Sequence, residues 1–410
     1  MQRDPLRFYS LLISISNNTS LRYKHAARRA QRILTTMEKI HASKKTNIQP
    51  DLDCYRYVLM TMSRSKDPAI GLSIPKLFQA MEGSQIFPDT ACFDAAIETL
   101  KNCARYSTEK DADKYANAAE SMLERMEKER DRSSVSIIKP SSLTYNNVIQ
   151  ALAARETKES AEHADVFLKK MEAEYDGGDE SMRPTRDSYL GTIYAYGKSG
   201  DEFNYIHANE VLQRMIGQYS QGNDMARPDI SSFHAVIRAC ARASDTSSSH
   251  EKHKEALYLA ISTVQYMKRS DFDRPNATSY LLLLRCCTSL LPVGRERENT
   301  LRSIFRSCCK DGLVDQPVLK EFQSAVSTEM YHKEVVRDAP PYNGIKSLPC
   351  AWTRSLGYRV RTNEMEDGIG KRNPIISVSG EVIASTAYND HRMRRRWSKK
   401  NQKLLRGGRT

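Results

Sequence analysis

The sequence lacks any long apolar run. Among its 410 residues the strongest candidate, residues 280–284, is far shorter than the roughly 18 consecutive apolar residues that a membrane helix needs. A membrane-spanning helix is therefore not expected, and no membrane partner is predicted. The hydrophobic content of 40% is enough for a folded core.

Cysteine spacing gives no sign of a metal site or a disulfide framework. The nine cysteines are an odd number and none falls in a Cys-x-x-Cys pair. Two adjacent pairs, Cys286-Cys287 and Cys308-Cys309, lie in apolar stretches with helical spacing. We expect reduced core thiols in a reducing compartment, with a redox contact between neighbouring helices as the alternative for the two pairs.

Enzyme motifs are also missing. Residues 366–371 end like a phosphate loop, but Met365 replaces the first glycine and Arg372 replaces the Ser or Thr after the lysine. His250 and His253 share a helix face without a third ligand, and no zinc-deaminase signature is present. The sequence predicts a protein that is not an enzyme and needs no cofactor or metal.

What the sequence does have is positive charge, placed at its ends. The formal net charge is +13, of which residues 1–50 contribute +8 and residues 392–410 contribute +9, so the remaining body carries −4. A basic end can bind phosphates, whereas a slightly acidic body has little general attraction for them.

The body contains an internal repeat. A proline, a small polar residue, three further positions, an aromatic and then apolar residues recur along the chain. The aromatics are separated by 47, 38, 52, 44, 44 and 47 residues; they are Phe8, Tyr55, Phe93, Tyr145, Tyr189, Phe233 and Tyr280. Apolar residues four and seven positions later place each aromatic on one helix face, and the polar residue after proline can cap that helix.

A second helical stripe follows most aromatics by about thirty residues. Ala, then Leu or Val four later, then Met three later recurs, as in Ala164, Leu168 and Met171. Each unit is therefore predicted to be a hairpin of an A helix and a B helix, which cannot bury both stripes alone. Stacked hairpins bury them, so we predict an all-α, superhelical α-solenoid of about seven antiparallel helix-hairpin repeats, with a loop-rich C-terminal extension.

These motifs set the expected organisation. The array spans residues 5–315, in units near 5–51, 52–89, 90–141, 142–185, 186–229, 230–276 and 277–315. A capping helix is expected over 316–335, an irregular extension over 336–391 and a basic tail over 392–410. Residues 1–50 have the composition of a transit peptide but supply both helices of a repeat, which is the favoured interpretation. A cleavable address is then expected to be missing from this chain's start.

The repeat resembles the pentatricopeptide repeat family, most closely over residues 143–149. The tetratricopeptide repeat is the nearest competitor, but its Trp and Leu-Gly signature is absent. Four units exceed the family length of about 35 by polar, Gly-containing stretches such as residues 174–179, which are expected to be exposed loops.

The resemblance implies single-stranded RNA as a partner, with one base per repeat read by two or three side chains. In the family two residues of each unit read the base. The first reader is the residue after the aromatic, and the second reader is the residue after the terminal proline. Carried over, these are Tyr9 with Asp51, Arg56 with Asp89, Asp94 with Ser141, Asn146 with Thr185, Leu190 with Asp229, His234 with Asn276, and Leu281 with Asp315.

Only Asn146 among the first readers matches the family's Asn, Thr or Ser, and Leu190 and Leu281 offer no hydrogen bond. The apolar residue that sandwiches a base corresponds to Leu143 in that unit. The second readers are equally consistent with ordinary helix caps. Weakly sequence-coded binding is therefore expected.

The tail adds a second candidate contact, since Arg394, Arg395 and Arg396 can neutralise phosphates and Trp397 can stack on a base. A solvated tail that resembles a nuclear address is the alternative. The resulting hypothesis is an RNA-binding adaptor of the mitochondrion or plastid, acting in RNA processing, stability or translation. The alternative is a protein-binding scaffold, such as a subunit associated with an organellar ribosome, with other protein subunits as partners.

Overall fold

The computed structural model describes residues 5–17, 23–43, 49–132, 138–246, 249–336, 345 and 348–356. The chain divides into a unit of residues 1–364 and a second unit of residues 365–410, which lies outside the described residues. Within the described part no helix is long and apolar enough to cross a membrane.

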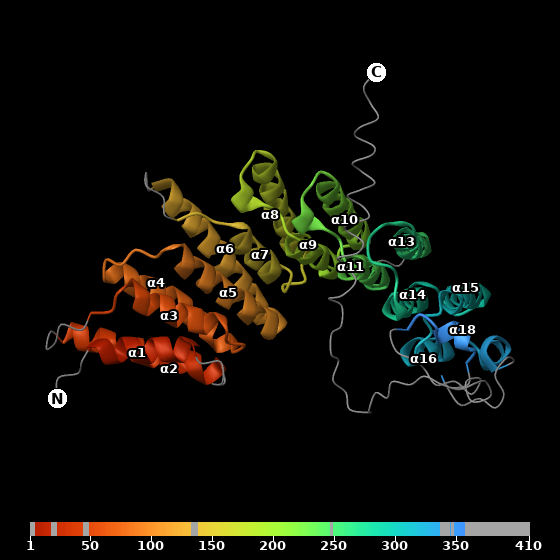
Figure 1. Cartoon of the computed structure of the whole chain (residues 1–410), viewed down its shortest axis with the longest axis horizontal. Helices are drawn as coiled ribbons and strands as arrows, with labels where there is room; N and C mark the ends of the chain where they lie inside the picture. Colours follow the sequence, from red (N-terminus) through yellow and green to blue (C-terminus); the bar gives the residue numbers. More distant parts are fainter. Residues whose placement is uncertain are drawn as a thin grey trace, which may run out of the picture. The chain divides into compact units, whose positions relative to one another are not determined.

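Helices alternate along the first unit as the repeat predicts (Figure 1). The A helices are α1 Pro5–Asn17, α3 Leu52–Ser63, α5 Thr90–Tyr106, α7 Ser142–Leu152, α9 Arg186–Lys198, α11 Ile230–Ala241 and α14 Ala277–Leu290. The B helices are α2 Tyr23–Ala42, α4 Ile74–Gly83, α6 Glu109–Arg132, α8 Lys158–Asp176, α10 Asn204–Ser220, α13 His250–Arg269 and α15 Arg295–Asp311. Short elements between them are η1 Pro68–Ser73, η2 Glu180–Met182, η3 Asp224–Ala226 and α12 Ala243–Thr246.

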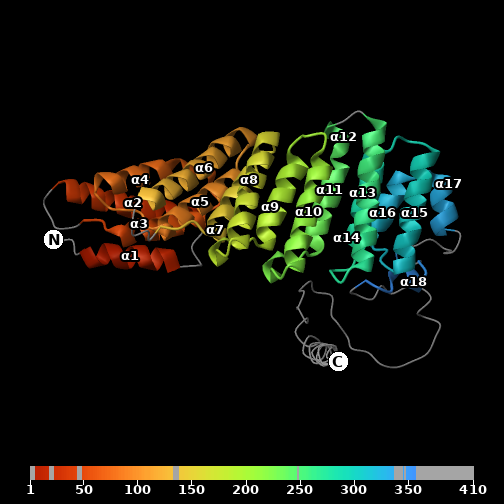
Figure 2. The same ribbon diagram turned by 90° about the horizontal axis from the view of Figure 1, so that it is seen from above.

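Neighbouring hairpins pack side by side (Figure 2). The A helices form one continuous row, in which each packs on the next from α1 to α14 and then on α16. The B helices α6, α8, α10 and α13 each pack on their own A helix and on the following one. This arrangement, with no strand in the described residues, confirms the predicted α-solenoid of helix hairpins.

Both predicted stripes form the core. Each aromatic from Tyr55 to Tyr280 is at most 1% exposed, and so are the Ala and Met positions of the B stripes. Because every stripe lies between two neighbours, the core continues from unit to unit instead of closing within one hairpin. All nine cysteines are free, and all except Cys350 are buried. Burial raises the pKa of the Cys92 thiol to about 12, which keeps it protonated at neutral pH.

The insertions after the B helices are built into the stack. In two of them a single 3-10 turn, η2 or η3, returns the chain to the next A helix. The Asn223 side-chain amide donates to the Pro184 carbonyl of the preceding unit at 2.9 Å, and within one unit the Ser142 hydroxyl donates to the Arg183 carbonyl at 2.6 Å. The extra residues predicted to be exposed loops therefore also hold the chain to its own A helix and, through Asn223, to the preceding unit.

The end of the array differs from the predicted single capping helix over 316–335. The structure has α16 Gln316–Ala325, α17 Thr328–Tyr331 and a π turn, η4 His332–Val336. Val326 is extended, and the Ser327 side chain starts a new helix by accepting the Met330 backbone N–H at 3.4 Å. The sequence prediction overlooked this second cap, because a serine within an apolar pattern is as compatible with the interior of a helix as with its start.

A short segment then folds back onto α15. It contains α18 Cys350–Thr353, and the Trp352 ring packs edge-on against Phe305 at 5.8 Å between centroids. The Trp352 carbonyl accepts from the Val314 N–H at 2.9 Å, and the Arg354 guanidinium donates to the Lys310 carbonyl at 2.7 Å. This segment thus supplies a donor to one carbonyl in the last turn of α15.

Tyrosine hydroxyls add a polar layer to the core. The Tyr55 hydroxyl donates to Glu38 at 2.9 Å, and the Tyr189 hydroxyl donates to Glu172 at 2.9 Å. In each case the carboxylate belongs to the preceding B helix. Burial and then the neighbouring carboxylate raise the pKa of Tyr189, so the phenol stays protonated and keeps donating.

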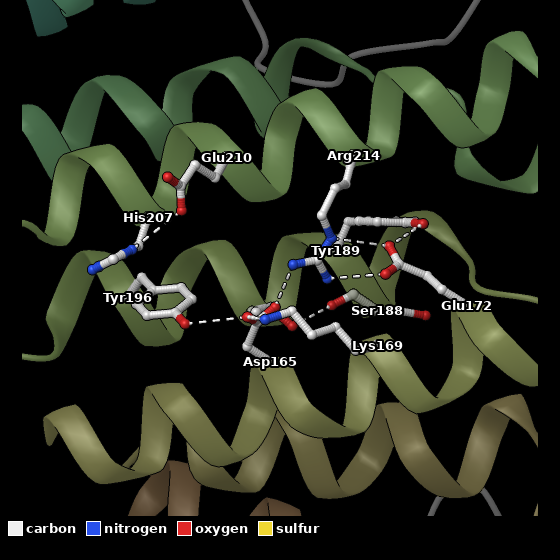
Figure 3. Close-up of polar contacts among 10 residues, drawn as sticks. Asp165, Lys169, Glu172, Ser188, Tyr189, Tyr196, His207, Glu210 and Arg214 are labelled. Atoms are coloured by element: carbon white, nitrogen blue, oxygen red, sulfur yellow. Dashed lines mark hydrogen bonds and ion pairs between the residues drawn. The ribbon is translucent and has the colours of Figure 1, made fainter.

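A cluster of charged side chains joins α8 to α10 beside α9 (Figure 3). The Arg214 guanidinium lies 2.6 Å from Asp165 and 3.2 Å from Glu172, and Lys169 lies 2.9 Å from the second Asp165 oxygen. Both carboxylates are largely buried, so their charges depend on these cations.

We therefore expect Arg214→Met to lower the free energy of unfolding by about 2–3 kcal/mol, because it leaves two buried carboxylates without their shared cation. Lys114→Met, which removes an exposed pair with Asp111, is the control and should leave stability nearly unchanged. Urea unfolding followed by circular dichroism measures both. Equal effects of the two substitutions would contradict the expectation.

Candidate nucleic-acid interface

The second readers all lie at helix starts. Asp51, Asp89, Asp229, Asn276 and Asp315 are N-caps whose side chains accept the backbone N–H three residues on. Ser141 and Thr185 also occupy the N-cap position, where their own backbone N–H groups donate to Thr144 and Ser188 at 3.0 and 2.9 Å. The capping role weighed in the sequence analysis is therefore present at every one of these positions.

Asn146 and Thr185 are brought together as the resemblance implies, but they bond to each other. The Asn146 amide nitrogen donates to the Thr185 hydroxyl at 3.0 Å, and its carbonyl accepts from the Ser188 hydroxyl at 2.5 Å. Asn146 is 7% exposed. Both polar atoms that would meet a base edge are thus engaged between α7 and α9, and a base would have to displace one of these bonds.

The same contact recurs along the row of A helices. The residue after the aromatic meets the first turn of the next A helix: Arg56 pairs with Asp89 at 2.5 Å, and Asp94 accepts from Thr144 at 2.6 Å. His234 bonds Ser279 at 2.7 Å. Leu190 and Leu281 occupy the equivalent place and pack against the core. These positions together form the inter-unit row of the array.

The sequence analysis missed the hydroxyl residues that complete this row. Thr144, Ser188 and Ser279 each stand directly before a repeat aromatic and serve as partners across the boundary. Their recurrence at one repeat position was visible in the sequence. Which neighbour they would contact was not, because that depends on how the units are packed.

His234 illustrates the electrostatics of the row. Burial first, and then the nearby Arg238 charge, lower its pKa to about 4. The imidazole is therefore neutral at physiological pH and acts as a hydrogen-bond partner for Ser279.

Two grooves run over the A helices. Groove 1 has a volume of about 690 Å³. It is lined by Met60, Ser63, Arg64, Lys66, Ala91, Asp94, Ala95, Glu98, Asn102, Tyr106, Leu143 and Asn147. Leu143, the predicted base-sandwiching residue, is 58% exposed here. An apolar side chain held in the open is what a stacking contact requires.

Groove 1 also presents polar atoms at Asp94 and Asn147. Asn147 is almost fully buried, and within the described residues the only hydrogen bond of its side chain is the one its carbonyl accepts from Lys101 at 2.9 Å. Burial raises the pKa of Asp94, whose one oxygen accepts from Thr144. An amide donor and a carboxylate acceptor can meet the hydrogen-bonding edge of a base.

Groove 2 is larger, at about 910 Å³, and crosses α5, α7, α9 and α11. Its cationic lining residues are Arg105, Lys198, Arg238 and Arg242, against the acids Glu156 and Asp187. Small residues make its floor, and at Gly191 an added Cβ would lie 2.9 Å from the Ile149 side chain. The two grooves adjoin where α5 ends, at Arg105 and Tyr106. The family resemblance did not point to the basic residues that line either groove.

The tail residues Arg394, Arg395, Arg396 and Trp397, and the side chain of Tyr9, lie outside the described residues. Their proposed RNA contacts stay predictions. So do the reading roles of Asn146, Thr185 and the other carried-over pairs.

The Arg56–Asp89 contact gives a pH-dependent test. Burial alone would raise the pKa of Asp89, but hydrogen bonds from Cys92 and Arg56 bring it below its usual 3.8. A depressed carboxyl pKa stabilises the fold above the unfolded pKa, and this contribution is lost as pH falls through the folded value.

Asp89→Asn keeps a competent cap but removes the charge, so it should be less stable than wild type at pH 7 by about 1 kcal/mol. The difference should shrink once pH falls below 3.8. Urea unfolding of both chains at pH 7 and near pH 3 measures this. A difference that does not change between the two pH values would contradict the charge as its origin.

No family model matches the chain, and no curated protein matches it. Solved structures do match, among them "Crystal structure of the pentatricopeptide repeat protein PPR10 in complex with an 18-nt psaJ RNA element" and a structure of that protein with three cysteines replaced by serine, bound to the same RNA element. Each is 16% identical with a TM-score of 0.35 and covers 80% of this chain, which spans 50% of the matched chain. The fold assignment rests instead on the repeat and its stacked hairpins: the chain is a helical-repeat α-solenoid.

Proposed function

We propose that the chain binds single-stranded RNA along its row of A helices, as an adaptor without catalytic activity. The observation that carries this proposal is the pair of adjoining grooves, which combine cations with exposed apolar and aromatic side chains. The cations can bind the phosphates of an RNA, and the exposed apolar and aromatic side chains can stack on its unpaired bases. The matched structures hold RNA, which is in keeping with the proposal but does not carry it.

We further propose that the chain acts on organellar RNA in a mitochondrion or plastid, and that it affects RNA processing, stability or translation. Its support is the family resemblance and the basic first 50 residues. The route by which the chain would modulate its RNA is occupancy: a bound segment is withheld from nucleases and from pairing.

Base selectivity is expected to be weak. In the inter-unit row both polar atoms of the Asn146 side chain already form hydrogen bonds. In two other units the equivalent residue is an apolar leucine, Leu190 or Leu281. Selectivity would then concentrate in groove 1, where Asp94 and Asn147 keep atoms for a ligand. The cations of the grooves supply affinity for any sequence.

The same inter-unit row favours the second candidate, a protein-binding scaffold. If side chains at the reading positions serve to join units, the A-helix surface needs no base to explain them. A peptide partner would use the apolar floor of groove 2 instead of its cations.

Crosslinking in cells followed by sequencing of the bound RNA separates the two candidates. Wild type, Asn146→Ala and a chain lacking residues 392–410 are compared. Discrete RNA recovered with wild type supports the adaptor, and its absence overturns it. If only the tail deletion abolishes recovery, the array does not hold the RNA.

A binding test in vitro isolates groove 2. In Arg238→Ala/Arg242→Ala the slope of log K against log salt should fall by about 1.4, because each phosphate neutralised on a single strand contributes about 0.7. Fluorescence anisotropy with a labelled single-stranded RNA at several salt concentrations gives the slope.

The control is Arg269→Ala/Arg274→Ala, which removes the same charge from exposed positions outside groove 2. Equal slopes for the two double variants would show that only net charge matters, and would remove the groove from the proposal.

A further inference from the structure

Tyr106 is one of several exposed aromatic side chains in the described residues, and it is the one that lines groove 1. It is the last residue of α5 and 44% exposed, whereas the seven repeat aromatics serve the core. Its position is none of the predicted reading positions, and the repeat does not call for a ring there. Part of the ring is therefore open to solvent within groove 1.

Two cations flank the ring. The Lys66 ammonium lies 5.4 Å and the Arg105 guanidinium 5.9 Å from the Tyr106 ring centroid. Within the described chain neither forms an ion pair with a carboxylate. Both therefore keep their charge available for an anion that approaches the ring.

The surrounding backbone is held in place. Ser65 and Asp67, on either side of Lys66, are buried, and Asp67 pairs with Arg28 at 2.7 Å. The Asn102 amide nitrogen donates to the Ser63 carbonyl at 2.6 Å and ties α5 to the end of α3. The Lys66 backbone and the end of α5 are thus preorganised, which lowers the entropy cost of binding.

This ring, its two cations and Asn102 we name the Tyr106 platform. Tyr106, Lys66 and Asn102 line groove 1, together with the partly exposed Met60, and Arg105 lines the adjoining groove 2. The platform therefore lies where a strand that follows the A-helix row passes from one groove to the other.

We propose that the Tyr106 platform anchors one nucleotide of a single-stranded RNA, with the base stacked on Tyr106 and the adjacent phosphates bound by Lys66 and Arg105. The Asn102 carbonyl can accept from an amine of the base. Because every base has a π face, the anchor accepts any sequence and favours purines, whose larger faces stack better. The inference rests on the proposed RNA binding and adds to it a contact outside the reading positions.

The test uses the full chain and fluorescein-labelled oligoadenylate and oligouridylate of about 15 nucleotides. Tyr106→Ala should weaken oligoadenylate binding about tenfold, as expected for the loss of one base–aromatic stacking contact, with less effect on oligouridylate. Tyr106→Phe keeps the ring and should bind like wild type. The slope of log K against log salt should stay unchanged in both.

The cations give the complementary result. Lys66→Ala and Arg105→Ala should each reduce the salt slope by about 0.7 and weaken both RNAs alike. Photocrosslinking of RNA to wild type, followed by mass spectrometry, should yield a modified peptide that contains Tyr106. Thermal unfolding by circular dichroism checks that each variant folds.

The outcomes separate the two proposals. If wild type binds neither RNA, the proposed function fails and this inference with it. If wild type binds and Tyr106→Ala binds equally well, the anchor alone is overturned. Tyr106→Phe as weak as Tyr106→Ala would also overturn stacking, since only the hydroxyl differs. Displacement of the RNA by polyglutamate at equal charge would show a site for anions in general.

Discussion

The structure depends on one constraint: a two-helix unit cannot bury its own apolar stripes. The A-helix aromatic and the B-helix Ala-Leu-Met stripe are covered only when a neighbour packs on each side. Stability is therefore a property of the boundaries between units. The polar contacts follow the same rule, since the Asp165–Arg214–Glu172 cluster and the Asn146–Thr185 bond both cross from one helix pair to the next.

Spacing along the chain was sufficient to predict the helices and their buried faces. Steps of three and four residues define a stripe locally, so Tyr145, Ile149 and Leu152 could be placed in the core from sequence alone. The caps were equally local, because Asp89 or Ser141 bonds residues only three positions away. The break at Val326 was missed because its cap, Ser327, fits an interior position as well as a start.

The candidate site was less accessible to sequence reasoning, for a physical reason. Whether Asn146 faces solvent or its neighbour depends on how closely α7 approaches α9, and no local pattern encodes that distance. Tyr106 and Lys66 lie 40 positions apart and become neighbours only through the α3–α5 contact. Their residue types were visible, but their proximity was not.

The two glycines in α9 show what the A-helix surface requires. Gly191 and Gly197 lie inside a helix, where glycine is less favourable than alanine by about 1 kcal/mol each. An added Cβ would come 2.9 Å from Ile149 at the first and 3.2 Å from Ala239 at the second. The missing methyl groups let α9 lie against α7 and α11 and leave the floor of groove 2 open. An alanine at either position would push α9 away from a neighbouring A helix, so the close spacing of the central units and the depth of groove 2 both depend on residues that helix propensity alone would disfavour.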